Sequence, residues 1–354
     1  MDKTTFRTKT LLSLGIALGL FGLGYVLISS RKPPEAPLIQ KLEGYAQGTT
    51  YHMSYVGPLD AELGPAVENS LAQFDKIFSN YRPDSDISRF NTSTSLDWFP
   101  VDPSLVQLMQ RSQQISAQSF GLFDVSLGAL IKAWGFGAYK RAEPRVPTAS
   151  EIQLALKQSG FQHYHTQESP PALKKDIPEL LIDLSGIAQG YAVDQVAKLF
   201  EQRGHKAYFI EIGGETLAKG EKAPGQDWTL AIETPEVEPG AFAQWVHPHG
   251  KAVATSGDYR NYFEKDGKRY THILDPRSGR PIDHPLASVS VIADDCTSAD
   301  AFAKAYMILG PEAAAKFAET MKMPILMLIK QASGNFEQRS AAGFDSYLMQ
   351  AEKP

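Results

Sequence analysis

The feature that most constrains this chain is an uncharged run of 21 residues, positions 10–30, which follows the basic residues Lys3, Arg7 and Lys9. About 20 apolar residues span a bilayer, whereas the apolar part of a cleavable signal is usually about 7–15 residues long. The length favours an uncleaved anchor at residues 1–30, although Gly22 and Gly24 also offer a small-residue cleavage site. The basic flank predicts that the N-terminus stays inside the cell while the rest is translocated.

The remainder of the chain has the composition of an ordinary globular protein. Of 354 residues, 43% are hydrophobic and 21% charged, which allows a sizeable core. We interpret the proline-containing residues 31–41 as a stiff linker, 42–345 as one domain and 346–354 as a tail. The single cysteine, Cys296, excludes a disulfide framework and a multi-cysteine metal site. A net charge of −5 argues against a nucleic-acid partner.

Helical and strand patterns follow one another irregularly through residues 42–345. Apolar residues at helical spacing, with capping residues, predict helices that start near positions 64, 103, 150, 187, 298 and 312. Runs rich in β-branched and aromatic residues predict strands at 207–212, 228–234, 251–255, 271–274, 287–293 and 324–329. Since the two kinds do not alternate strictly, we expect an α+β fold in a single mixed domain rather than a doubly wound sheet.

Five stretches combine glycine, carboxylates and small polar residues where a strand meets a helix. At 182–191 an acid precedes a glycine turn that opens a helix. Backbone N–H groups and the helix dipole at such a turn would face a bound anion. An ordinary capped helix is the alternative. Gly213 and Gly214 permit either a close backbone approach or a plain tight turn. The other stretches are 80–91 with 120–126, 254–259 with 270–281, and 294–300.

Single residues in these stretches suit particular chemistry. His272 and Arg277 flank an Asp-Pro turn and are equipped for phosphate contact. Asp300 lies near hydroxyls in the first turns of a helix, where Mg²⁺ would find oxygen ligands, although acids also stabilise helix N-termini by themselves. Tyr81 can stack on a flat ring or serve a structural role. The chain has no G-x-S-x-G elbow and no Walker A loop, so serine hydrolase and nucleoside-triphosphatase functions have no support.

Together and in this order, the five stretches resemble the ApbE-type flavin transferases, the FAD:protein FMN transferases, over about residues 42–329. The most specific matches are YRPDSDISRFN at 81–91, DLSGIAQGYA at 183–192, TSG at 255–257, HILDPRSG at 272–279 and ADA at 299–301. The resemblance implies the family's single mixed α+β domain. It also implies Mg²⁺-dependent transfer of FMN from FAD to a Thr or Ser hydroxyl of a target protein, typically a membrane redox-complex subunit, with release of AMP.

The resemblance further implies roles for individual residues. His272 would help to deprotonate the acceptor hydroxyl or steady the pyrophosphate. The Gly186 carbonyl and the Asp300 carboxylate would bind the metal, and Asp300 would thereby take part in catalysis. The implied FAD-binding positions are Gln47, Tyr81, Leu122, Phe123, Asp124, Asp183, Gln189, Thr255, Ser256, Gly257, His272 and Ile273.

One position departs from the family pattern. Members usually carry Thr four residues after the metal-binding Asp, on the same helix face, but this chain has Lys304 there. A charged ammonium cannot be a metal ligand. Lys304 therefore either takes over part of the cation's role, pairs with Asp300, removes the metal altogether, or points to solvent while water completes the metal shell. Gln47 and Gln189 are milder departures, from Met and from Lys or Glu.

Two other functions use the same residues. An Mg²⁺-dependent FAD pyrophosphatase would let water replace the protein hydroxyl and release FMN and AMP. A non-catalytic extracytoplasmic FAD-binding protein is the other alternative, and Lys304 is the residue that favours it. The expected location is the cytoplasmic (inner) membrane, with the domain anchored on the periplasmic side.

Overall fold

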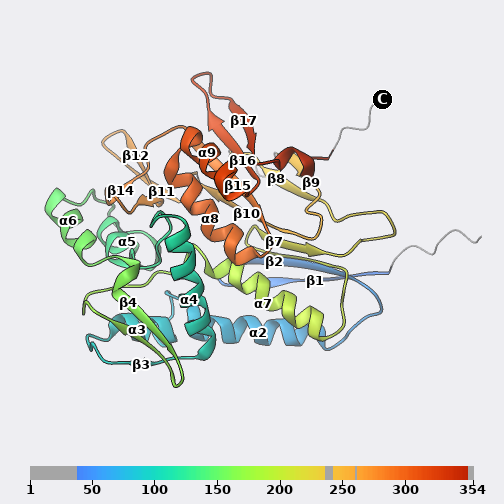
Figure 1. The fold of residues 1–354 in the computed structure, drawn as a ribbon, viewed down its shortest axis with the longest axis horizontal. Coiled ribbons are helices and arrows are strands. Elements are labelled where there is room, and N and C mark those ends of the chain that lie inside the picture. Colours follow the sequence, from blue (N-terminus) through green and yellow to red (C-terminus); the bar gives the residue numbers. More distant parts are fainter. Residues whose placement is uncertain (1–37, 236–241, 260, 350–354) are drawn as a thin grey trace, which may run out of the picture. The chain divides into compact units, whose positions relative to one another are not determined.

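The computed structural model describes residues 38–235, 242–259 and 261–349 (Figure 1). The predicted anchor at 1–30 lies outside these residues, as do positions 31–37 of the linker and 350–354 of the tail. None of the helices within the described ranges has the length and apolarity needed to span a bilayer. The first strand already begins at Ile39, three residues before the predicted start of the domain.

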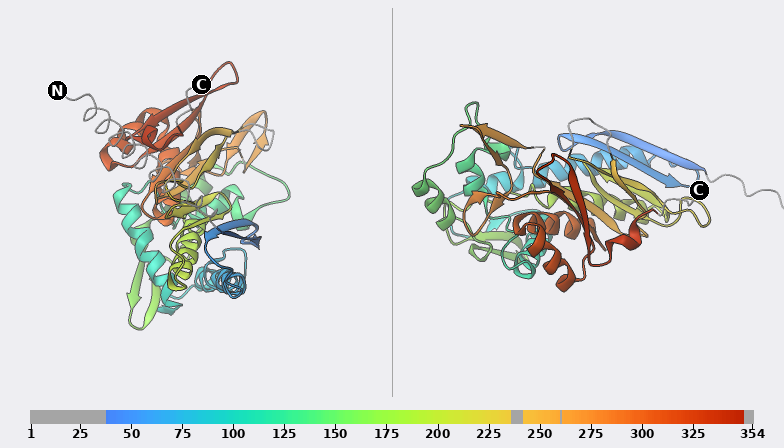
Figure 2. Two further views of the ribbon diagram at one scale, coloured as in Figure 1. Left: turned by 90° about the vertical axis from the view of Figure 1, so that its right-hand side faces the viewer. Right: turned by 90° about the horizontal axis from the view of Figure 1, so that it is seen from above.

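An eight-stranded sheet forms the centre of the domain, and all its neighbouring strands pair antiparallel. The hairpin of β1 (Ile39–Ala46) with β2 (Thr49–Val56) and the hairpin of β16 (Ile325–Lys330) with β17 (Phe336–Ala341) occupy its two ends, blue and red in Figure 2. In order across the sheet, the strands are β1 (Ile39–Ala46), β2 (Thr49–Val56), β6 (Tyr208–Ile212), β7 (Glu215–Lys219), β10 (Ala252–Gly257), β15 (Leu286–Ala293), β16 (Ile325–Lys330) and β17 (Phe336–Ala341).

Helices cover one face of this sheet. They are α2 (Leu63–Phe78), α7 (Ala188–Gln202), α8 (Cys296–Leu309) and α9 (Pro311–Met321). Helix α8 packs on β10 and β15 and also contacts α7 and α9, and α7 and α8 lie across the sheet in Figure 1. Because α8 is enclosed by these neighbours, nearly all its residues are buried, which explains its apolar, alanine-rich sequence rather than a two-faced one.

A hairpin covers the other face of the central strands. Strands β8 (Leu230–Glu233) and β9 (Phe242–Val246) bring Ile232 and Val246 onto Val253, Ile292 and Leu326. The 3-10 helix η3 (Phe344–Tyr347) adds the buried Phe344 to this layer. With both faces covered, β15 and β16 are buried along almost their whole length.

The remaining elements build the side of the domain next to the functional site. Trp134 donates its indole N–H to the Gly279 carbonyl (2.8 Å) and packs on Tyr270, which fixes the segment around His272. The elements on this side of the domain are α3 (Asp86–Thr92), β3 (Phe99–Pro100), α4 (Pro103–Gln118), α5 (Gly128–Trp134), η1 (Gly137–Tyr139), α6 (Ala149–Lys157), η2 (Phe161–His163), β4 (Tyr164–Glu168), β5 (Pro171–Lys175), β11 (Tyr262–Lys265), β12 (Lys268–Thr271), β13 (Leu274–Asp275) and β14 (Arg280–Pro281).

The predicted mixture of helices and strands is confirmed, with local corrections. The predicted strand at 271–274 is wrong, because β12 ends at Thr271 and β13 begins at Leu274, so His272 and Ile273 lie in the connection between them. The third predicted helix begins earlier than position 150. Its cap is Thr148, which forms a capping box with Glu151.

Two carboxylates lock α7 to α8. Asp194 in α7 accepts hydrogen bonds from the N–H groups of Cys296 and Thr297, each at 2.9 Å, and so satisfies free donors at the start of α8. In return, Asp300 in α8 accepts a hydrogen bond from the Gly190 N–H in the first turn of α7 (3.2 Å). The helices approach this closely because residue 190 is glycine: a Cβ there would lie 2.3 Å from the Cys296 carbonyl oxygen.

We therefore expect Gly190→Ala to lower the free energy of unfolding by about 1–3 kcal/mol, the usual cost of overpacking a core contact. Urea unfolding followed by circular dichroism measures this. Gly64→Ala in α2 is the matched control, because its Cβ would meet only Leu42 Cδ2, at 3.6 Å, and should change stability by less than about 0.5 kcal/mol. Equal effects of the two substitutions would contradict this account of the crossing.

Candidate active site

The site opens where two neighbouring strands of the sheet separate. Strands β7 and β10 pair only at Thr216 with Val253 and at Leu217 with Ala252, whereas β10 stays paired with β15 as far as Gly257. Side chains alternate along a strand, and in β10 the Ser256 hydroxyl contacts α8, whereas Val253 packs with the β8–β9 layer. The separation therefore leaves an opening between the helix side and the hairpin side of the sheet.

A first pocket of about 330 Å³ lies on the helix side of this opening. It brings together segments that are far apart in the sequence, namely the loop at 122–125, the turn before α7, the end of β10 and the β12–β13 connection. The predicted positions that line it are Leu122, Phe123, Asp124, Asp183, Gly186, Gln189, Thr255, Ser256, Gly257, His272 and Ile273.

A second pocket of about 490 Å³ adjoins the first and shares Ser185 and Gln189 with it. The predicted positions Gln47 and Tyr81 line this pocket, and Tyr81 stands 68% exposed. Gln189, in the first turn of α7, lines both pockets, and the N-terminal end of this helix has no side-chain cap. Two pockets that meet at an uncapped helix N-terminus suit a ligand with two ring systems joined by an anionic group.

The segment at 80–91, which contains Tyr81, also supports the turn before α7. Asn80 and Asn91 each donate a hydrogen bond to the Ile182 carbonyl (2.7 Å). Their side-chain oxygens accept from the N–H groups of Leu184 (2.9 Å) and Ile182 (2.7 Å). These four hydrogen bonds fix the backbone on both sides of Asp183, which lines the first pocket.

Several buried polar atoms in the two pockets have no hydrogen-bond partner among the described residues. They are both amide atoms of Gln47, Asp183 Oδ2 and Glu215 Oε2. Burial raises the pKa of Asp183 above its usual value. Leaving such groups unsatisfied costs about 1–3 kcal/mol each, so the atoms are suited to ligand contacts. Asp124 differs, because its two oxygens accept from the N–H groups of Ser126 (2.7 Å) and Phe161 (2.9 Å).

His272 is held with one nitrogen available. The Asn261 carbonyl lies 2.9 Å from Nδ1 and also accepts from the His272 backbone N–H (3.0 Å). A carbonyl can only accept, so we assign the proton to Nδ1 and the lone pair to Nε2. Burial, assisted by the Lys304 charge, lowers the pKa of His272 to about 4. The imidazole is therefore neutral at pH 7.

Lys304 and Asp300 form a partly buried pair beside this pocket. Lys304 Nζ donates to Ser256 Oγ (2.7 Å) and lies 3.4 Å from Asp300 Oδ1, and Asp300 is 1% exposed. Burial and the neighbouring Asp300 carboxylate raise the pKa of Glu215 well above its usual range, whereas Lys304 acts in the opposite direction. Within the described part of the chain, no group of three or more His, Cys, Asp or Glu side chains is arranged to hold a metal ion.

Some residues differ from their sequence-based expectations. Arg277 is paired with Asp275 through Nε (2.9 Å) and Nη2 (2.8 Å) and is not among the residues that line the first pocket, so its contact with a phosphate stays a prediction. Glu215, which directly follows the glycine pair, lines the first pocket although the sequence did not single it out as a site residue. Asp295 caps helix α8, because its carboxylate accepts from the Ser298 N–H (2.7 Å).

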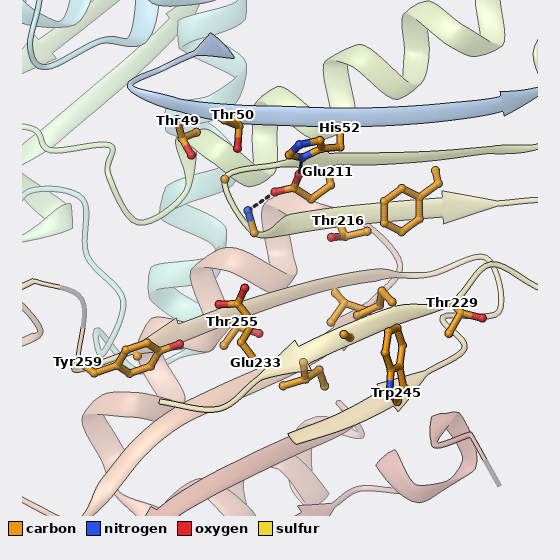
Figure 3. A pocket seen from close by; sticks show the side chains of 18 residues that line it. Thr49, Thr50, His52, Glu211, Thr216, Thr229, Glu233, Trp245, Thr255 and Tyr259 are labelled. Carbon is orange, nitrogen blue, oxygen red and sulfur yellow. Dashed lines mark hydrogen bonds and ion pairs between the residues drawn. The ribbon is translucent and has the colours of Figure 1, made fainter. Parts of the chain in front are cut away.

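A third pocket of about 540 Å³ lies on the hairpin side of the opening (Figure 3). It shares Gly213, Thr255 and Gly257 with the first pocket. Glu211 accepts from the Gly214 N–H (2.6 Å) and pairs with His52 (2.7 Å), which braces the glycine turn between the pockets. Its lining combines hydroxyl side chains and Trp245 with apolar side chains, and the labelled lining residues are Thr49, Thr50, His52, Glu211, Thr216, Thr229, Glu233, Trp245, Thr255 and Tyr259.

Comparison with known proteins finds one family throughout. The family model described as the ApbE family matches residues 47–327. A Vibrio cholerae protein named FAD:protein FMN transferase is 37% identical, over 91% of this chain and 96% of its own length. A Salmonella typhimurium protein of the same name is 35% identical, over 92% and 95%. Two solved structures are similar as well: the flavin transferase ApbE from Vibrio cholerae (TM-score 0.79, 35% identity, 88% of this chain and 100% of that one) and the apo Pseudomonas stutzeri flavinyl transferase ApbE (TM-score 0.80, 38% identity, 89% and 98%).

The environment of His272 predicts an unusual titration. Because its folded pKa of about 4 lies below the usual value of about 6.5, the neutral ring stabilises the fold above pH 6.5, and this contribution is lost as pH falls through 4. We expect the NMR signal of His272 in carbon-13-labelled protein, assigned by its absence in His272→Gln, to titrate near pH 4. The variant should also lose less stability than the wild type between pH 6.5 and 4. A midpoint near 6.5 would exclude the buried neutral state.

Proposed function

The chain belongs to the ApbE family and is an enzyme that transfers FMN from FAD to a target protein, and we propose that FAD occupies the two adjoining pockets at the start of α7. The observation that carries this placement is the set of unpartnered buried polar atoms of Gln47 and Asp183, which lie on either side of that helix end. The uncapped N-terminus between them would face the pyrophosphate. Tyr81 would stack against one ring and Phe123 would form a wall for the other.

The proposed reaction is attack by a Thr or Ser hydroxyl of the acceptor on the phosphorus of the FMN half of FAD. A bond forms between the hydroxyl oxygen and this phosphorus, and the P–O bond to AMP breaks, so that AMP leaves. A hydroxyl is a poor nucleophile, and we propose that the lone pair on His272 Nε2 accepts its proton. Since the pKa of His272 is low, the ring would pass this proton on readily to the departing phosphate or to solvent.

The magnesium ion expected from the sequence does not fit the residues present. Of the two expected ligands, Asp300 already accepts from the Gly190 N–H with Oδ2 and lies beside the Lys304 ammonium with Oδ1. Mg²⁺ needs a nearly ideal octahedron of oxygen ligands at about 2.0–2.1 Å. A fixed positive charge next to a proposed ligand opposes this. We therefore assign the transfer to protein groups alone.

We place the acceptor segment in the third pocket. This pocket shares Gly213, Thr255 and Gly257 with the first pocket, so a hydroxyl on a bound segment would lie next to the proposed FAD site. Its mixed lining of threonine hydroxyls and an exposed tryptophan, Trp245, suits a polypeptide with short polar side chains. The acceptor we propose is a subunit of a membrane redox complex.

We further propose that the enzyme works on the periplasmic side of the cytoplasmic membrane. The support is the sequence of residues 10–30, which is uncharged and preceded by Lys3, Arg7 and Lys9. An anchor of this kind would hold the catalytic domain close to membrane-bound acceptors. Protease added to intact spheroplasts should digest the domain, and complete protection would contradict this location.

The function is tested with the full-length protein in detergent, FAD, and a soluble acceptor domain carrying the flavinylation threonine of a membrane redox-complex subunit. We expect FMN on the acceptor, seen by mass spectrometry, with an equal amount of AMP. A Thr→Ala acceptor is the control. Free FMN and AMP with an unmodified acceptor would indicate a pyrophosphatase, and intact bound FAD would indicate a binding protein.

The same assay separates the acceptor pocket from the FAD pockets. We expect Trp245→Ala to raise the KM for the acceptor about 10-fold, the scale of an interface hot spot, with the dissociation constant for FAD unchanged. Gln244→Ala is the matched control on β9, because Gln244 bonds to Gln338 (2.8 Å) outside the pocket. An unchanged acceptor KM in Trp245→Ala would place the acceptor elsewhere.

A further inference from the structure

We propose that the Lys304 ammonium is the resident cation of this active site, so that FMN transfer by this chain proceeds without a divalent metal. The inference rests on the proposed function, because it assigns the charge that offsets the pyrophosphate of FAD. The proposal gives Lys304, the residue that departs from the family's metal-site pattern, a catalytic role.

The first argument is where the Lys304 side chain lies. It leaves α8 one turn after Asp300 and passes along Gly186: a Cβ on Gly186 would lie 3.4 Å from Lys304 Cγ and 3.8 Å from Cε. The two groups expected to share a metal, the Gly186 carbonyl and the Asp300 carboxylate, therefore belong to residues that both flank this side chain. The side chain fills the space beside them.

The second argument is that Asp300 is already occupied. Its Oδ2 accepts from the Gly190 N–H (3.2 Å) and its Oδ1 faces Lys304 Nζ (3.4 Å). The side chain of Asp300 is 2% exposed and that of Lys304 is 22% exposed. Removing either partner from such a buried ion pair leaves an uncompensated charge, so the pair holds the ammonium in place. A metal would have to displace the lysine from this carboxylate.

The third argument is the set of hydrogen-bond donors that remains. An ammonium has three donors. Lys304 directs two of them toward Ser256 Oγ and Asp300 Oδ1, which leaves one N–H for a ligand. Because Ser256 Oγ accepts from Lys304, its own hydroxyl hydrogen is also free to donate. Lys304 and Ser256 both line the first pocket. Together they form a compact pair of donors for phosphate oxygens.

These donors fit the charge change of the reaction. As the bond between the FMN phosphorus and the bridging oxygen breaks, negative charge builds up on the AMP phosphate that leaves. A fixed ammonium and a directed hydroxyl in a partly buried site stabilise this charge without reorganising. The electron pair of the broken bond stays on AMP, and the hydroxyl proton passes to His272 Nε2, so the step balances without another reactant.

The test compares the full-length wild type with Lys304→Thr and Lys304→Met, each with EDTA and with Mg²⁺, in the FMN transfer assay. We expect EDTA to change the wild-type rate less than 2-fold. Lys304→Thr restores an oxygen ligand and removes the ammonium, so it should lose about 100-fold in EDTA and recover with Mg²⁺. Lys304→Met offers neither group and should stay impaired in both. Thermal melting and FAD binding check that the variants fold.

A second measurement does not depend on activity. Binding of Mn²⁺ in the presence of FAD, followed by electron paramagnetic resonance, should be absent in the wild type and present in Lys304→Thr. Wild-type transfer that stops in EDTA and returns with Mg²⁺ would overturn the Lys304 proposal and leave the proposed function intact. Wild-type Mn²⁺ binding that is lost in Asp300→Ala would also overturn it. Absence of transfer and of AMP under every condition would instead refute the proposed function.

Discussion

The crossing of α7 and α8 is the contact on which the rest of the site depends. Gly190 lets the two helices touch, and each helix supplies a carboxylate to the free N–H groups at the start of the other, Asp194 for α8 and Asp300 for α7. These donors would otherwise be unsatisfied within the fold. The same contact places the start of α7 between two pockets and sets Asp300 beside Lys304. Stability and site geometry are therefore served by the same few atoms.

The sheet contributes a second constraint, which concerns where its strands cease to pair. Strands β7 and β10 separate after two residue pairs, whereas β10 remains paired with β15. The unpaired edge supplies Thr255, Ser256 and Gly257 to the pockets, and the glycine turn before β7 supplies the other side. Flexible loops are not needed to form the opening, because paired strands and braced turns define both of its margins.

Much of the fold and the site was predictable from local patterns, and the failures have physical causes. Gly190 and Asp300 lie within recognisable motifs, so their neighbourhood could be anticipated. The pairing of Arg277 with Asp275 could not, because a short-range ion pair competes with a ligand only once the turn geometry is known. Glu215 was missed because a lone acid after a glycine turn looks exposed in sequence. The sequence also left four interpretations of Lys304 open, and only the packing of its side chain against Gly186 and its contacts with Ser256 and Asp300 bear on the choice.

The opening between β7 and β10 has a consequence for the kinetics. It lies between a pocket on the helix side of the sheet and a pocket on the hairpin side, which share only Gly213, Thr255 and Gly257, so a dinucleotide and a polypeptide can be bound at the same time. Direct transfer in such a ternary complex follows sequential rather than ping-pong kinetics and involves no flavin-enzyme intermediate. A single in-line displacement through the sheet would also invert the configuration at phosphorus, whereas a two-step route through the enzyme would retain it.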